Sequence, residues 1–465
     1  MAARETTRIL PVHRLSKGPE PGQSLSEWWE AERSRGTPEA AAVIEAADAL
    51  RTTDVPVAFP TETVYGLGAD ATRSDAVRGI YKAKQRPSDN PLIVHVDSLS
   101  MLQRLLNPNA AQQANSAATT AAGPVAEANL IPPIYQPLIS RFWPGPLTII
   151  LPNPPGSLLA KEVTSNLTTF GVRIPASPFA RLLIHVTDRP LAAPSANAST
   201  RPSPTTAQHV YHDLHGRINL ILDGGPCGVG VESTVVDGLS DPPAILRPGG
   251  IGIEEIRSCP GWENVKIAYH DGSLQVKEIP RAPGMKYRHY SPKAKVVLFE
   301  PGSKPASVTR RVREDLENGA VGAHSVGIIR TRNWAKGLGI VPEDELAKAT
   351  ASQEPSSMQN GARRQSLDTE SAPEVLATIT PPSPVCFKVT VHDKATGAHK
   401  VKDVYDYPLG ADLESIARGL FAALRCLDEL NVDIIYVEGI PDREGDLAAA
   451  IMNRLRKAAE AEIRV

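Results

Sequence analysis

The chain is poor in cysteine and has no long apolar run. Only four of its 465 residues are cysteines, and no two of them form a Cys-x-x-Cys pair. They are Cys227, Cys259, Cys386 and Cys426. This scatter argues against a zinc ribbon or a disulfide-stapled secreted domain and favours a reducing compartment. The apolar stretches are far shorter than the roughly 20 residues of a membrane-spanning helix, so we expect no transmembrane segment.

A large net charge and a P-loop are absent as well. The formal net charge is −2, so no global positive field would draw the chain onto nucleic acid or an anionic membrane. Any polyanion must therefore bind at a local cluster of basic residues. The phosphate-binding pattern Gly-x-x-x-x-Gly-Lys-Ser/Thr does not occur either.

The N-terminus has no apolar core of the kind that marks a secretory signal. Its basic residues outnumber its acidic ones, with Arg4, Arg8, Arg14 and Lys17 against Glu5 and Glu20. We expect a cytoplasmic protein, and a weak mitochondrial signal remains the alternative.

The length predicts two or three domains. Residues 1–38 show little periodicity beyond one short helix near Trp28 and Trp29, and they form an N-terminal extension. The other predicted segments are a catalytic domain at 39–274, an alanine-rich insertion at 107–133, a proline-punctuated linker at 275–293, a C-terminal domain at 294–465 and a disordered loop at 341–384.

The catalytic domain is predicted to be α/β, because strand patterns alternate with helical ones. The short spacing of its later strands indicates a twisted sheet with both parallel and antiparallel pairs. Helices are expected from Pro38, with Thr37 as N-cap, and from Ser74 to the residue before Pro87. The expected strands are 55–60, 91–96, 144–151, 170–175, 191–193, 218–222, 233–236 and 244–246.

The C-terminal domain is predicted to be a smaller α/β unit with a parallel sheet. Its expected strands are 295–299, 326–329 and 432–437. A long helix is expected around Leu413–Leu427 and a last helix at 444–460, where Asn453 and Arg454 are interpreted as surface residues.

A basic run, Lys82-Ala83-Lys84-Gln85-Arg86-Pro87, is the first candidate for ligand binding. Basic residues near a helix C-terminus can simply complement the helix dipole. Here the proline and a polar turn precede a buried strand, and this layout favours a phosphate site. Spacing alone leaves open whether Lys82 or Lys84 faces the phosphates.

Three further polar clusters each give a weak signal alone. The loop Pro60-Thr-Glu-Thr-Val-Tyr-Gly-Leu-Gly68 offers hydroxyls and glycines that permit close backbone approach. Pro194-Ser-Ala-Asn197 follows a buried strand, which is where ligands bind in open α/β sheets. Ser233 opens another strand, and Arg247 ends the next one. Cys227 has no histidine nearby in the sequence and is interpreted as incidental.

Taken in order, these segments resemble one family. The motifs are Pro-Thr-Glu-Thr-Val-Tyr-Gly-Leu-Gly, Lys-Ala-Lys-Gln-Arg-Pro, Trp-Pro-Gly-Pro-Leu-Thr, Gly-Val-Arg-Ile-Pro, Ala-Pro-Ser-Ala-Asn, Glu-Ser-Thr-Val-Val-Asp and Leu-Arg-Pro-Gly. Together they resemble the YrdC-type threonylcarbamoyl-AMP synthases, over about residues 39–260. The linker Pro283-Gly-Met-Lys-Tyr-Arg-His-Tyr-Ser-Pro292 and the C-terminal unit are similar to the long form of that family.

The resemblance implies an enzyme that joins L-threonine, bicarbonate and ATP into threonylcarbamoyl-AMP and pyrophosphate. It implies Mg²⁺ with the ATP, no metal ligand from the protein and no organic cofactor. A separate tRNA-modifying transferase complex would use the product on the adenosine beside the anticodon. Direct RNA contact is a further expectation, and membrane contact is not expected.

The same resemblance implies roles for individual residues. The expected threonine contacts are Thr61, Asn90, Arg173, Ala193 and Ser233. The expected ATP contacts are Lys84, Arg86, Thr169, Ser195, Asn197, Ser203, Arg247 and Tyr290, the last as part of a lid. The choice between Thr61 and Thr63 stays open. The geometry near Ser203 is also open, because Ala-Ser-Thr-Arg-Pro-Ser replaces a Ser-Gly turn there.

Two other classes of function have some support in the sequence. A non-catalytic RNA-binding module could use the same basic surface, although the net charge of −2 argues against it. A carbamoyltransferase of the hydrogenase-maturation type contains a related domain, but it needs zinc-finger cysteine pairs that this chain lacks.

Overall fold

The computed structural model divides the chain into two compact units. They are Met1–Ser291 with Asp442–Ala458, and Pro292–Pro441 with Ala459–Val465. The described residues are 6–88, 90–107, 130–268, 289–317, 325–342, 346, 383–394 and 397–465. Most of the predicted insertion at 107–133, of the linker at 275–293 and of the loop at 341–384 therefore lies outside the described residues.

The first unit contains a mixed sheet, as the sequence predicted. Its strand order is β1-β8-β2-β3-β7-β4-β6-β5-β9-β10-β11, and it contains both parallel pairs, such as β4–β6, and antiparallel pairs, such as β5–β6. The strands are β1 (Arg8–Pro11), β2 (Val57–Phe59), β3 (Gly66–Asp70), β4 (Ile93–His95), β5 (Leu147–Pro152), β6 (Thr169–Arg173), β7 (Leu191–Ala192), β8 (Leu220–Asp223), β9 (Thr234–Asp237), β10 (Ala244–Arg247) and β11 (Lys266–Ile267).

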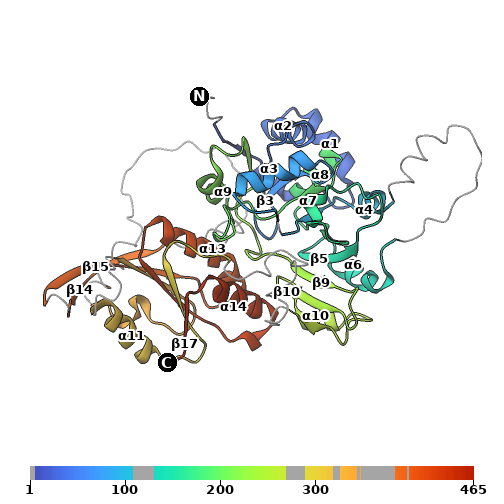
Figure 1. Ribbon diagram of the computed structural model, residues 1–465. Coiled ribbons are helices and arrows are strands. Elements are labelled where there is room, and N and C mark those ends of the chain that lie inside the picture. Colours follow the sequence, from blue (N-terminus) through green and yellow to red (C-terminus); the bar gives the residue numbers. More distant parts are fainter. Residues whose placement is uncertain are drawn as a thin grey trace, which may run out of the picture. The chain divides into compact units, whose positions relative to one another are not determined.

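The helices of this unit follow the apolar periodicity of the sequence. Figure 1 shows α1, α2 and α8 lying together, and the three pack against one another. The helices are α1 (Leu25–Ser34), α2 (Pro38–Thr52), α3 (Ser74–Lys84), α4 (Leu99–Leu106), α6 (Gln136–Phe142), α7 (Lys161–Thr164), α8 (Pro178–Thr187), α9 (Ala207–Leu214), α10 (Ile253–Arg257) and α14 (Asp446–Ala458). Thr37 caps α2 as expected, because its side chain accepts a hydrogen bond from the amide of Ala40.

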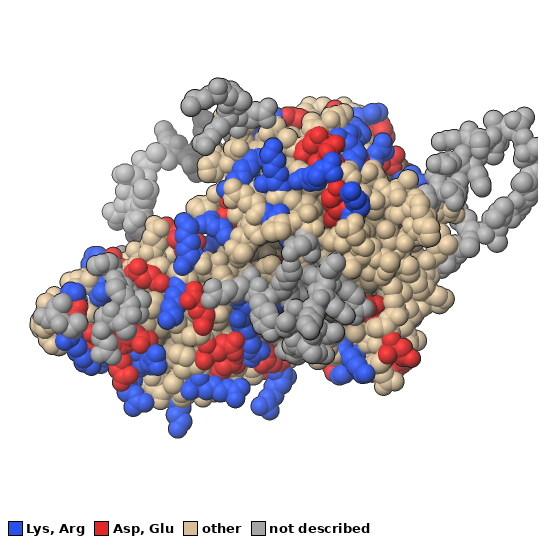
Figure 2. Space-filling view, in the orientation of Figure 1, with Lys and Arg blue, Asp and Glu red and all other residues tan. Residues whose placement is uncertain are grey.

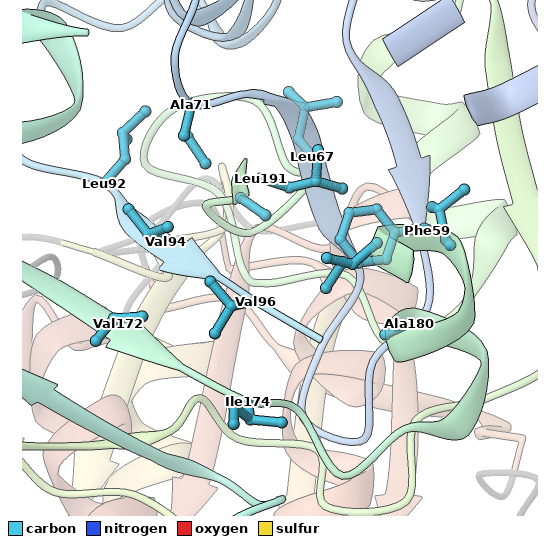
Figure 3. Packing of buried hydrophobic residues seen from close by; sticks show 14 of the residues in the cluster. Phe59, Leu67, Ala71, Leu92, Val94, Val96, Val172, Ile174, Ala180 and Leu191 are labelled. Carbon is cyan, nitrogen blue, oxygen red and sulfur yellow. The ribbon is translucent and has the colours of Figure 1, made fainter. Parts of the chain in front are cut away.

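The core of the first unit lies between the sheet and these helices. Figure 3 shows buried side chains from several strands, among them Phe59, Leu67, Val94 and Val172, gathered in one apolar cluster. Burial of such side chains stabilises the fold by about 1.5–3 kcal/mol each. The polar residues that follow these strands are thereby held on a rigid frame.

The N-terminal extension is more ordered than its sequence suggested. Strand β1 pairs in parallel with β8 and extends the sheet. Helix α1 begins with a capping box between Ser24 and Glu27. Trp28 and Trp29 are buried in the same core as residues of strands β2, β3 and β4, so the segment is part of the first unit.

The second unit is a six-stranded, mostly parallel sheet in the order β14-β15-β13-β16-β12-β17. Its elements are β12 (Lys295–Phe299), α11 (Pro305–Glu317), β13 (Ser325–Arg330), β14 (Val385–His392), β15 (His399–Pro408), α13 (Leu413–Glu429), β16 (Ile434–Glu438) and β17 (Ala461–Ile463). Among the described strands of this second sheet, only β14 and β15 pair in antiparallel fashion. A parallel-sheet unit was predicted, while the β14–β15 pair was not.

One helix lies elsewhere than expected. The sequence assigned the last helix to the C-terminal domain, but α14 belongs to the first unit. Arg454 on this helix was interpreted as a surface residue, and this was wrong, because its side chain is fully buried.

Acidic and basic side chains are interspersed on the face of the molecule that Figure 2 shows. This mixture agrees with the formal net charge of −2. A polyanion would therefore bind only where cationic side chains are locally concentrated.

Candidate active site

A cavity of about 90 Å³ in the first unit brings most of the predicted site residues together. Eleven of the thirteen lie on its wall: Thr61, Lys84, Arg86, Arg173, Ala193, Ser195, Asn197, Ser203, Ser233, Arg247 and Tyr290. Asn90 and Thr169 are not among the lining residues. The wall also contains Thr63, the residue that the sequence left open as the alternative to Thr61. Its other polar residues include His95, Arg201, Glu232 and His289, which the sequence did not single out.

Charge is distributed very unevenly on this wall. Five of the described lining residues are Lys or Arg, namely Lys84, Arg86, Arg173, Arg201 and Arg247. Among the described lining residues, Glu232 is the one carboxylate. Cationic groups held in a partly closed space attract anions much more strongly than the same groups on an open surface.

Lys84 is the last residue of α3, and it faces inward. Its Nζ donates hydrogen bonds to the carbonyl of Ser195 and, at 2.7 Å, to that of Asn197. The helix ends because Gln85 adopts a left-handed conformation with φ 52°. Lys82 is exposed, whereas Lys84 is 2 % exposed. Of the two lysines that the sequence left open, Lys84 therefore lies on the cavity wall.

The threonines after β2 adjoin a buried arginine. Thr61 Oγ1 donates to the carbonyl of Val64 at 2.7 Å and lies 2.9 Å from Thr63 Oγ1. Arg173, at the end of β6, donates from Nη2 to Thr63 Oγ1 at 3.1 Å. Its Nε has no hydrogen-bond partner among the described residues. A buried guanidinium with an unused donor is suited to a carboxylate ligand.

His95 lies beside this arginine, because the two residues are partners in the β4–β6 register. Its Nδ1 is 3.2 Å from the carbonyl oxygen of Ile93. Burial, followed by the charge of Arg173, lowers the pKa of His95 well below its usual value. The ring is therefore neutral at physiological pH. The sequence signal for His95 is a titratable residue inside the apolar stretch 91–96, and His95 was not predicted to be a site residue.

Ser233 and Arg247 form a second buried group. Arg247 donates from Nε to the Ser233 carbonyl at 3.1 Å and from Nη2 to Ser233 Oγ at 3.0 Å. Burial lowers the pKa of Arg247 to about 10, so it stays charged at neutral pH. A Cβ at Gly249 would lie 2.2 Å from the amide nitrogen of Thr234, so the turn after β10 requires glycine.

Ser203 donates a hydrogen bond of 2.5 Å to Glu232 Oε1. Burial alone would raise the pKa of Glu232. The charges of Arg454 and Arg247, together with the bond from Ser203, instead lower it. Glu232 is therefore ionised at neutral pH although it is 7 % exposed. Its identity as a site residue could not be foreseen, because its partners are distant in the sequence.

The end of the linker closes one part of the wall. Tyr290 is buried, and the next residue, Ser291, donates its amide to the carbonyl of Thr200 at 2.9 Å. Burial, followed by the charge of Glu232, raises the pKa of Tyr290 to about 12. Burial, followed by the charge of Arg86, lowers the pKa of His289 to about 4. Both side chains are thus uncharged at neutral pH.

Cys227 is buried, and burial raises the pKa of its thiol. A thiol held in the protonated form is a poor nucleophile, in agreement with the expectation that this cysteine is incidental. None of the described helices is both long and apolar enough to cross a membrane.

Two family models together match nearly the whole chain. Residues 49–249 match a family described as "Telomere recombination", and residues 251–460 match one described as "Threonylcarbamoyl-AMP synthase, C-terminal domain". The chain is 46 % identical over 426 residues to the threonylcarbamoyl-AMP synthase of Schizosaccharomyces pombe, covering 90 % of this chain and 88 % of that one. It is 38 % identical to the Bacillus subtilis enzyme of the same name, with 90 % and 92 % covered.

A solved structure agrees with these matches. The structure of Pyrococcus abyssi Sua5 in complex with L-threonine superimposes with a TM-score of 0.65 at 33 % identity, covering 99 % of this chain and all of that one. The cavity, the two-unit fold and the matches along the whole length agree: the chain belongs to the Sua5/YrdC family of threonylcarbamoyl-AMP synthases, in the long form with a Sua5 C-terminal domain.

Proposed function

We propose that the cavity joins L-threonine, bicarbonate and ATP into threonylcarbamoyl-AMP and releases pyrophosphate. The observation that supports this most is the wall, whose described residues include five cationic side chains and a single carboxylate. Each of the three substrates is negatively charged or has a negatively charged group. Such a wall would neutralise their charges while they are held together.

Threonine would bind near Arg173. Its carboxylate would accept hydrogen bonds from this guanidinium, whose Nε has no partner among the described residues. Its hydroxyl and amine would face the polar groups of Thr61, Thr63 and Ser233. The expected contacts from Asn90 and Ala193 complete this proposal. The L-threonine in the complex of the Pyrococcus abyssi relative supports it.

ATP would bind to the cationic residues of the wall other than Arg173. Lys84 and Arg86 would face the phosphates, and Arg247 would contact the nucleotide. The proposed polar contacts are Ser195, Asn197, Ser203 and Thr169, and Tyr290 would act as part of a lid.

The chemistry has two steps. The threonine amine attacks the carbon of bicarbonate, a C–N bond forms and water leaves, which gives a carbamate. A carbamate oxygen then attacks the α-phosphorus of ATP, and the bond to pyrophosphate breaks. Since carbamates decompose in water, a closed site favours the product. Catalysis of the second step would come mainly from positioning and charge neutralisation.

Mg²⁺ would accompany the ATP. Within the described ranges no group of three His, Cys, Asp or Glu side chains is arranged to hold a metal ion. The wall instead provides hydroxyl and amide oxygens, which fit a cation held mainly by phosphates and water. When bound, the ion would neutralise phosphate charge. A tRNA-modifying transferase complex would consume the adenylate product.

Product analysis tests the proposal. ATP should be converted to AMP and pyrophosphate only when L-threonine and bicarbonate are both present, and threonylcarbamoyl-AMP should be detected by mass spectrometry. Replacement of L-threonine by glycine or L-valine provides the matched controls. Turnover of ATP at the same rate without threonine would refute the proposal.

A further inference from the structure

Helix α14 contributes a buried cation to the back of the cavity wall. The chain reaches this helix only after residues 292–441 of the second unit, yet α14 packs within the first unit. Arg454 on this helix is 0 % exposed. It is not among the residues that line the cavity.

The guanidinium of Arg454 joins two segments of the wall. Its Nε donates to Glu232 Oε2 at 3.1 Å, and its Nη1 donates to the carbonyl of Pro248. Glu232 directly precedes Ser233, and Pro248 directly follows Arg247. Arg454 therefore contacts the neighbour of each residue in the Ser233–Arg247 pair.

The same contact extends to Ser203. Glu232 binds Arg454 through Oε2 and Ser203 through Oε1. Its two oxygens therefore have different partners, and the carboxylate plane is fixed between them. A carboxylate with a hydrogen bond to each of its two oxygens fixes the positions of its partners before a ligand binds.

Glu232 would repel phosphates unless its charge is balanced. Breaking a buried ion pair by removal of one partner leaves an uncompensated charge, which is strongly unfavourable. The titratable and charged groups that face this carboxylate come from three segments of the first unit. They are Arg454 and Lys457 of α14, Arg247 of β10, and His289 and Tyr290 of the linker.

We propose that Arg454 is a positioning residue for the nucleotide part of the site, acting through Glu232 on Ser203 and through Pro248 on Arg247. This inference rests on the proposed function, because it takes Ser203 and Arg247 as nucleotide contacts. Within the part of the chain that the structure describes, Arg173 and Thr63, which would bind threonine, have no hydrogen bond or ion pair with Arg454. Loss of Arg454 should therefore weaken the use of ATP more than the use of threonine.

The test compares two arginines on the same helix. Arg454→Met removes the charge and retains most of the side-chain length. Arg456→Met is the matched control, because Arg456 pairs with Asp442 at the surface. Arg454→Met should raise KM for ATP roughly tenfold or more, on the scale of a displaced contact. KM for threonine should rise less than KM for ATP, since Ser233 is its one proposed contact next to Glu232. Both KM values of Arg456→Met should stay within about twofold of the wild type.

A pH profile separates positioning from general stability. Without Arg454 the carboxylate of Glu232 loses its main countercharge, so it should bind a proton at higher pH. The acid limb of kcat/KM for ATP should then move to higher pH in Arg454→Met and stay in place in Arg456→Met. Arg454→Lys should restore part of the loss, because lysine can still pair with the carboxylate.

A double variant keeps the test valid if the single one fails to fold. Arg454→Met with Glu232→Gln removes both charges of the pair, which is better tolerated than removal of one. It should fold and still bind ATP weakly. Binding of a non-hydrolysable ATP analogue, measured by calorimetry, does not depend on turnover. Wild-type protein that binds the analogue but makes no adenylate would refute the proposed function alone. Unchanged ATP affinity in both variants, or equal losses for ATP and threonine, would overturn the role of Arg454.

Discussion

Replacement of Lys84 by methionine should reduce both stability and activity. Its ammonium group is buried and donates to the carbonyls of Ser195 and Asn197. A hydrogen bond to a charged group contributes about 1.5–3 kcal/mol. Two such bonds are lost in Lys84→Met, while water entering the cavity offsets part of the loss. We therefore expect the free energy of unfolding to fall by about 2–4 kcal/mol.

Activity should fall in the same variant. Loss of one preorganised charge contact removes about 2–4 kcal/mol of transition-state stabilisation. This corresponds to a decrease of roughly 30- to 1000-fold in kcat/KM. Arg86→Ala should lose activity on a similar scale, since Arg86 lies on the same wall. Urea denaturation and the formation of pyrophosphate measure the two effects on the same samples.

The matched control is Lys82→Met. Lys82 is on the same helix, two residues earlier, and it is exposed. Its stability should stay within about 0.5 kcal/mol of the wild type, and its activity should be unchanged. If Lys84→Met unfolds at the wild-type urea concentration, the ammonium group does not hold the Ser195–Asn197 loop. If Lys82→Met loses activity as Lys84→Met does, the orientation of the basic run is wrong.

Two further predictions concern the fold of the first unit. Gly79→Ala should lower the free energy of unfolding by about 2 kcal/mol or more, because a Cβ there would lie 1.9 Å from the carbonyl oxygen of Asp54. Gly228→Ala, where nothing lies within 4 Å, should be neutral in the same denaturation assay, and equal losses would contradict the steric reason. A hydrogen bond with Asp97 raises the pKa of His185, so this bond stabilises the fold fully below about pH 6.5 and less as pH rises through the raised value. His185→Gln should therefore lose more stability at about pH 5.5 than at about pH 8.5, and an equal loss at both would refute the assignment.

The strands and helices with clear periodicity could be predicted from the sequence. Strand β3 could not, because Gly66-Leu-Gly-Ala-Asp70 has two glycines where a strand usually has β-branched residues. The structure supplies the reason. A Cβ at Gly68 would lie 2.7 Å from Cε1 of Phe59, so the ring of the neighbouring strand occupies the space of a side chain. A glycine in such a strand marks close approach, which local sequence does not reveal.

Only some of the residues on the cavity wall could be predicted from the sequence. Residues such as Ser195 and Asn197 lie in short polar motifs after buried strands, and they could be found from chain order. Their individual roles stay predictions. His95 and Glu232 were missed, because a charged or titratable residue in an apolar stretch is informative only when its partner is known. The arginine that forms an ion pair with Glu232 is 222 residues away.

Buried arginines illustrate what the structure adds to such motifs. A buried charge must be paired or must face a ligand, so its partners indicate its role. Arg173 lies on the cavity wall with an Nε that lacks a partner among the described residues, and it is thus suited to an incoming anion. Arg454 also has a nitrogen, Nη2, without a partner among the described residues. It does not line the cavity, however, and it is bound to Glu232 and Pro248, so it is suited to holding other groups in place. The sequence alone does not reveal this difference, because it shows only that Arg454 lies in a helix, where it was interpreted as a surface residue. In this chain, helix α14 therefore lies behind a wall whose lining residues all come from residues 61–290, and it contacts that wall through Arg454.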